Sequence, residues 1–109
     1  CSPGTEIVYQ GKVAASHCID SRSKTYDGDQ WVSAELIVLG DDLVKHIING
    51  DTVLQYSKPQ IGGGVANRYD PKIKIDGKAL KSGFIALQSE GQPVDFKDIE
   101  IRQLPVPKS

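Results

Sequence analysis

Residues 31–39 read WVSAELIVL and contain the clearest strand signal in the chain. Successive side chains of an extended strand point to opposite faces, so every second residue shares a face. One face of this stretch begins with Trp31 and includes Glu35. The other face is entirely apolar and consists of Val32, Ala34, Leu36 and Val38. This alternation predicts a strand with one face toward a core and the other available for binding.

The alternation continues after a turn at Gly40. Residues 43–48 are predicted as a second strand, and Asn49-Gly50 follows them. Asn-Gly readily adopts the positive φ values of a two-residue hairpin turn, so the chain should reverse here into an antiparallel strand. That return strand is expected over residues 52–56 and should stop before Pro59, which has no N–H to donate.

The same pattern recurs toward both ends of the chain. Further strands are predicted at residues 5–9, 12–15, 72–75, 83–89 and 94–104, the last with a bulge near Lys97-Asp98. Residues 18–30 are polar and residues 60–71 contain three consecutive glycines, so both are predicted as loops. No helix-period segment of ten residues or more occurs. We therefore predict an all-β fold, an antiparallel β-sandwich of about seven short strands.

Composition and charge exclude some classes of function. A chain of 109 residues is one domain at most, and 39% hydrophobic with 25% charged residues is ordinary for a folded protein. The net charge of -1 provides no basic excess for binding nucleic acid. The apolar runs are too short for a membrane span.

The two cysteines of the chain indicate the cellular compartment in which the protein works. Cys1 and Cys18 flank a hairpin-like stretch at residues 7–13, which can bring its flanks together. We therefore predict a Cys1–Cys18 disulfide and a periplasmic or secreted location. Two free thiols in a cytosolic protein are the alternative, and a lipid-modified Cys1 is another. Because the chain begins at Cys1 without a leader, it is expected to be a mature or excised piece.

Several motifs occur in a familiar order. They are WVSAEL at 31–36, HIING at 46–50, VLQY at 53–56, GFIALQSEG at 83–91 and PVDFKDIEI at 93–101. Together they resemble the 3-keto-disaccharide hydrolase-like family, with Phe84, Lys97 and Asp98 in place of the family's Tyr, Arg and Asn. The resemblance implies a concanavalin A-like jelly roll. The family domain is longer, so residues 1–109 are expected to be its C-terminal portion. The complementary N-terminal half, or another chain, would supply the missing strands.

The resemblance also implies a carbohydrate-active hydrolase or lyase that cleaves glycosidic bonds of 3-keto-glycosides. Such an elimination needs a base, an enolate stabiliser and an acid. The candidate catalytic residues are Glu35, His46 and Glu90, and the candidate substrate-binding residues are Trp31, Gln88 and Lys97. His17 is a further polar candidate. Each also has a purely structural interpretation, such as hydrogen-bonded packing for His46 or solvation for Lys97.

A divalent metal is a candidate enolate stabiliser. The turn acids Asp27 and Asp29, and Asp41 with Asp42, are the acidic pairs that calcium would favour. No His/Cys cluster has zinc spacing.

The alternative function is a non-catalytic carbohydrate-binding module, since one fold can host either role. A binder needs aromatic platforms, and Trp31, Tyr26 and Tyr69 are the obvious ones. Aromatic residues make up only 6% of the chain, which favours the enzyme.

Overall fold

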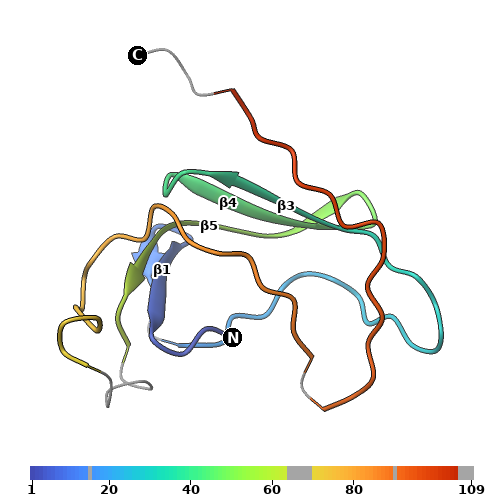
Figure 1. Ribbon diagram of the computed structural model, residues 1–109, viewed down its shortest axis with the longest axis horizontal. Helices are drawn as coiled ribbons and strands as arrows, with labels where there is room; N and C mark the ends of the chain where they lie inside the picture. The colour runs from blue at the N-terminus through green and yellow to red at the C-terminus, as the bar shows by residue number, and fades with distance from the viewer. Residues whose placement is uncertain (15, 64–69, 90, 106–109) are drawn as a thin grey trace.

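The structure is a computed structural model that describes residues 1–14, 16–63, 70–89 and 91–105. Within these ranges the chain is all-β, as predicted, and forms one antiparallel sheet (Figure 1). The strands are β1 (Thr5–Tyr9), β2 (Lys12–Val13), β3 (Ala34–Leu39), β4 (Leu43–Ile48) and β5 (Asp51–Ile61). Their order across the sheet is β2-β1-β5-β4-β3. The second layer of a sandwich is not formed by the described residues.

The central meander of β3, β4 and β5 follows the sequence prediction. β3 pairs with β4 over six residue pairs, with Leu36 opposite His46. The turn from β4 to β5 has positive φ at Asn49 (47°) and at Gly50 (86°), which confirms the Asn-Gly hairpin. The turn between β1 and β2 likewise has positive φ at Gln10 and Gly11.

Strand β5 is longer than predicted, and the expected stop before Pro59 is wrong. The strand continues because it changes partners: its first half pairs with β4 and its second half with β1. Lys58 marks the change, with a φ of 50° and a backbone N–H that donates to the Asp41 carbonyl at 2.7 Å. Pro59 lies within this irregularity, and sheets tolerate proline at such places.

The strands predicted at residues 72–75, 83–89 and 94–104 are not formed. Among residues 70–89 and 91–105 the sheet gains only an isolated bridge between Gln60 and Ala79. These segments alternate like strands, but no backbone hydrogen bond joins them to a described strand, so they are irregular chain (yellow to red in Figure 1). Most of their large apolar side chains are exposed, Phe84 completely.

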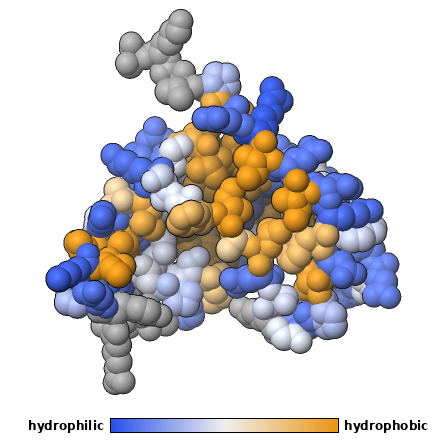
Figure 2. Space-filling model, viewed as in Figure 1, coloured by the Kyte–Doolittle hydropathy of each residue, from blue (hydrophilic) through white to orange (hydrophobic). Residues whose placement is uncertain are grey.

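The core is small because only part of the apolar sheet face is covered. Val44 and Val53 are buried, with 5% and 7% exposed. Leu36 and Val38 on β3 belong to the same face as Val44, as the alternation predicts, yet they are 52% and 50% exposed. Figure 2 shows hydrophobic side chains gathered over the middle of the molecule with hydrophilic residues around them.

The polar segment at residues 18–30 contains no strand, as predicted, and two contacts hold it in place. The predicted disulfide joins Cys1 to Cys18. The Arg22 N–H donates to the Val53 carbonyl at 2.8 Å, which fixes this loop against β5. Across the described ranges the chain offers no apolar helix of bilayer-spanning length.

Candidate functional site

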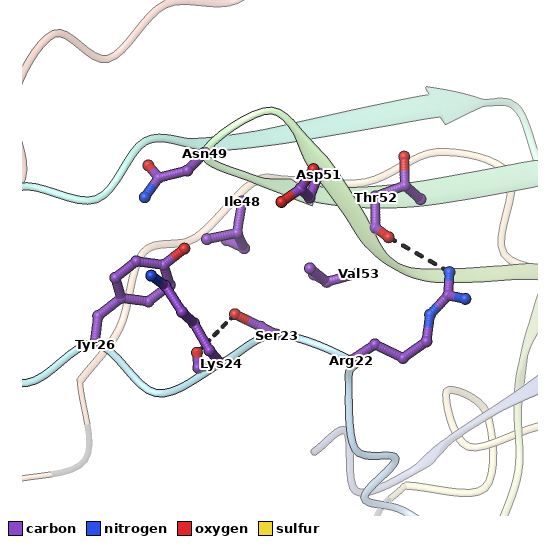
Figure 3. A pocket seen from close by; sticks show the side chains of 9 residues that line it. All are labelled: Arg22, Ser23, Lys24, Tyr26, Ile48, Asn49, Asp51, Thr52 and Val53. Atoms are coloured by element: carbon purple, nitrogen blue, oxygen red, sulfur yellow. Dashed lines mark hydrogen bonds between the residues drawn. The ribbon is translucent and has the colours of Figure 1, made fainter.

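An open pocket lies between the loop at residues 22–26 and the β4–β5 hairpin (Figure 3). Its volume is about 490 Å³, within the range of about 300–1,000 Å³ that is typical of small-molecule sites. The lining residues are Arg22, Ser23, Lys24, Tyr26, Ile48, Asn49, Asp51, Thr52 and Val53. The pocket therefore combines a small apolar patch with charged, hydroxyl and amide groups.

Two contacts of Arg22 join the loop wall of the pocket to the hairpin wall. Besides the backbone bond to Val53, its guanidinium Nη2 donates to the Thr52 carbonyl at 3.4 Å. Ile48 and Val53 point from the hairpin toward the loop in Figure 3. They form the apolar part of the pocket, and Val53 is one of the two buried core residues.

Asn49 holds the hairpin wall from the other side. Its positive φ places it at the tip of the turn, and its Oδ1 accepts a hydrogen bond from the Ser33 N–H at 2.9 Å. The pocket wall is thereby attached to the chain that leads into β3. Asparagine suits this position because it tolerates the left-handed backbone region and offers a short acceptor.

Both walls of the pocket contribute charged side chains. Arg22 and Lys24 come from the loop, and Asp51 comes from the first residue of β5. The Lys24 Nζ lies 4.9 Å from the centroid of the Tyr26 ring, a cation–π distance. Tyr26 was predicted as an aromatic platform, and the structure places it in the pocket.

A histidine–tyrosine pair lies on the sheet face that carries Ile48. His46 and Ile48 are two residues apart on β4 and therefore share a face. The His46 Nε2 and the Tyr56 hydroxyl are 3.0 Å apart, and the two rings meet edge to face with centroids separated by 5.3 Å. The pair stands about 7 Å along the strand from Ile48, since a strand rises about 3.3 Å per residue.

Burial changes the acid–base properties of this pair. Burial lowers the pKa of His46. Burial raises the pKa of Tyr56. His46 is therefore a neutral imidazole at pH 7, and Tyr56 keeps its proton. A neutral imidazole bonded to a phenol can accept or relay a proton.

The structure brings some of the predicted site residues together and separates others. Trp31 is 57% exposed, and the Lys97 Nζ lies 4.2 Å from its ring centroid, so these two predicted substrate-binding residues are in contact. Glu35 stands opposite Ile47 in the sheet, on the other face from His46. Gln88 is exposed on irregular chain.

The remaining candidates divide between exposed residues and residues outside the described ranges. His17 is exposed, and its carbonyl accepts a hydrogen bond from the Ser2 N–H at 2.6 Å. Glu90 and Tyr69 lie outside the described residues.

No group of three or more His, Cys, Asp or Glu side chains in the described part of the chain could hold a metal ion. Of the predicted acidic pairs, Asp41 and Asp42 face the Lys58 ammonium, whose Nζ donates to Asp42 Oδ1 at 2.7 Å. That hydrogen bond and the lysine charge lower the pKa of Asp42. The described residues therefore do not form a site that fits a resident metal.

These features define a disulfide-bonded all-β domain with a polar pocket on its sheet. The family described as the 3-keto-alpha-glucoside-1,2-lyase-like domain matches residues 5–102, and the chain belongs to this family. The resemblance found in the sequence motifs is thereby confirmed, and the family connects the domain with carbohydrate. The chain matches no curated protein and no solved structure.

Proposed function

We propose that the domain binds a 3-keto-glucoside and cleaves its glycosidic bond by elimination. The family supports the substrate class. The observation that carries the proposal is the His46–Tyr56 pair, which shares a sheet face with the pocket residue Ile48. His46 lies about 7 Å along β4 from the pocket residue Ile48, since a strand rises about 3.3 Å per residue. A substrate that extends from the pocket by about one sugar ring would therefore reach this neutral base.

The ketone at C3 makes this chemistry accessible. It acidifies the proton on C2, so a base can remove that proton and leave an enolate. The enolate electrons then form the C1–C2 double bond, and the bond from C1 to the leaving oxygen breaks. The leaving oxygen takes up a proton, and later addition of water to the double bond makes the overall reaction a hydrolysis.

His46 is the proposed base. Its burial keeps the imidazole neutral at pH 7, as a base must be. Tyr56 is a positioning residue whose hydroxyl orients the ring. Trp31 and Lys97 are proposed to bind a second part of the substrate, and Gln88 a sugar hydroxyl. Glu90 is proposed as the acid that protonates the leaving oxygen.

The two histidines of the chain, His46 and His17, allow a direct test of the proposed base. The complete protein is incubated with a 3-keto-glucoside and, separately, with the unoxidised glucoside. Turnover of the ketone alone is expected, lost in His46→Gln and retained in His17→Gln, because His17 is exposed and is not part of the His46–Tyr56 pair. Full turnover by a folded His46→Gln variant contradicts the assignment. Glu90→Gln should also reduce turnover without unfolding the protein.

A non-catalytic carbohydrate-binding module is the second candidate. Its support is the separation of Glu35 from His46 on opposite sheet faces, which leaves two of the predicted catalytic residues apart. A module of this kind would bind unoxidised sugars in the same pocket and turn over neither substrate. The incubation above therefore distinguishes the two functions.

We also propose that the domain works outside the cytoplasm and that further strands cover its sheet. The Cys1–Cys18 disulfide supports the first proposal. The half-exposed Leu36 and Val38 support the second, because exposed apolar side chains of this kind need a cover. The proposed cover lies over β3 and leaves the neighbouring His46–Tyr56 pair open to the substrate. The chain would then be the C-terminal portion of a jelly roll. Mass spectrometry of protein purified without reductant tests the disulfide and with it the compartment.

A further inference from the structure

The pocket carries an excess of positive charge. Arg22 and Lys24 line it from the loop, whereas Asp51 is its one acidic lining residue. None of the three takes part in an ion pair with another described residue. Two cations therefore face the pocket without a carboxylate partner in the described chain.

The contacts of the two cations orient them without using up their donors. The Arg22 guanidinium spends one N–H on the Thr52 carbonyl, at the long distance of 3.4 Å, and keeps its other donors. The Lys24 ammonium rests against the Tyr26 ring and has no hydrogen-bond partner among the described residues, so its N–H donors can meet an anion. Figure 3 shows the two side chains on either side of Ser23, both opposite the hairpin.

The rest of the pocket suits a sugar ring. Ile48 and Val53 offer an apolar surface for the C–H face of a pyranose, and Asn49 and Thr52 lie beside it. Sites for small polar ligands combine an apolar lining with a few placed polar groups in this way. An arginine with free donors recognises a carboxylate or phosphate in particular, because its planar fork matches the paired oxygens.

We propose that this pocket binds an anionic sugar, a hexose that carries a carboxylate or a phosphate. The inference deepens the proposed function and rests on its assignment of sugar binding to this pocket: it names an acidic sugar as the unit of the substrate held beside His46. The ring packs on Ile48 and Val53, and the anionic group meets the Arg22 guanidinium. The Lys24 ammonium, at the other end of the pocket in Figure 3, adds positive charge to the site. The Asp51 carboxylate accepts hydrogen bonds from the ring hydroxyls.

Binding is measured by calorimetry on the full chain with four probes: glucuronate, glucose 6-phosphate, glucose and inorganic phosphate. At least one anionic sugar is expected to bind about tenfold tighter than glucose and inorganic phosphate, with an affinity that falls as salt rises. The anionic sugar that binds tighter identifies the source of the charge. Equal binding of glucose and both anionic sugars overturns the proposal. Inorganic phosphate that binds as tightly as glucose 6-phosphate, with no preference for glucuronate, also overturns it, because the pocket would then be a site for a free anion.

Charge-removing variants locate the site. Arg22→Gln should lose most of the preference for the anionic sugar and Lys24→Gln a smaller part of it, while both keep the backbone bond from residue 22 to Val53. Lys45→Gln is the matched control, since Lys45 lies on β4 on the opposite face of the sheet from His46. Unchanged preference in Arg22→Gln and Lys24→Gln overturns the proposal.

The His46→Gln variant separates this inference from the proposed function. It should bind the anionic sugar like the wild type and turn over nothing. Turnover without any anionic preference contradicts the anionic pocket alone. Anionic preference without turnover contradicts the elimination alone.

Discussion

The side chain of Asn49 and the backbone of Ser33 form a two-way connection. Asn49 Oδ1 accepts from the Ser33 N–H at 2.9 Å, and the Asn49 N–H donates to the Ser33 carbonyl at 2.9 Å. One residue thus shapes the tip of the β4–β5 hairpin and ties it to the chain that enters β3. The pocket wall and the sheet edge depend on the same residue.

Asn49→Val should therefore destabilise the protein by about 2–3 kcal/mol. A β-branched residue at positive φ costs about 1–2 kcal/mol, and the lost hydrogen bond to Ser33 adds about 1 kcal/mol. Asn49→Gly is the control, because glycine accepts the backbone conformation and loses only the side-chain bond. Chemical denaturation measures both, and equal stability of the wild type and Asn49→Val would contradict the double role.

His46 should make stability depend on pH. Burial lowers its folded-state pKa below the ordinary value of 6.5, so the unfolded chain binds the proton first. The stabilisation is complete above pH 6.5 and is lost as the pH falls from 6.5 through the folded-state pKa. The unfolding free energy of the wild type should thus drop between pH 7.5 and 5.5, and less so in His46→Gln.

An NMR titration that places the pKa of His46 above 6.5 would refute the prediction. Tyr56→Phe removes the hydroxyl bonded to His46 and keeps the buried ring. It should leave the direction of the shift unchanged, because burial is its main cause.

Local patterns were enough to predict the hairpins, and long-range pairing was not. Asn49-Gly50 specifies its own turn, so β4 and the start of β5 follow from the sequence. The partnership of His46 with Tyr56 was missed because a regular hairpin would place Gln55 opposite Val44. The register shift beside His46 places Tyr56 there instead, and so turns it onto the face of His46.

The C-terminal strands were predicted from alternation alone, which describes a side-chain pattern and not a hydrogen-bond partner. Phe84 and Ile101 lie in runs with strand-like alternation, yet no backbone hydrogen bond joins these runs to a described strand. The contact of Trp31 with Lys97 could not be predicted from local patterns either. It joins residues far apart in the chain, and neither residue type carries a signal for the other.

Removal of the Cys1–Cys18 disulfide should lower the free energy of unfolding by about 3 kcal/mol. Without the bridge, the unfolded chain regains the conformational entropy of the loop between the two cysteines, which are 17 residues apart. The double variant Cys1→Ser/Cys18→Ser measures the loss by thermal unfolding. Reductant should lower the melting temperature of the wild type to that of the double variant and leave the latter unaffected. Two free thiols by mass spectrometry would rule the bridge out.

Lys97→Gln should change the fluorescence of Trp31, which is the one tryptophan of the chain. The ammonium lies 4.2 Å from the ring centroid, where an exposed cation–π contact contributes about 0.5–1 kcal/mol. Its removal alters the polarity at the indole and releases the C-terminal segment from the start of β3, so the emission maximum should shift. Lys97→Arg should preserve the contact, and Lys24→Gln, which acts on Tyr26, should leave the emission unchanged. Identical spectra for Lys97→Gln and the wild type would show that the contact is not formed in solution.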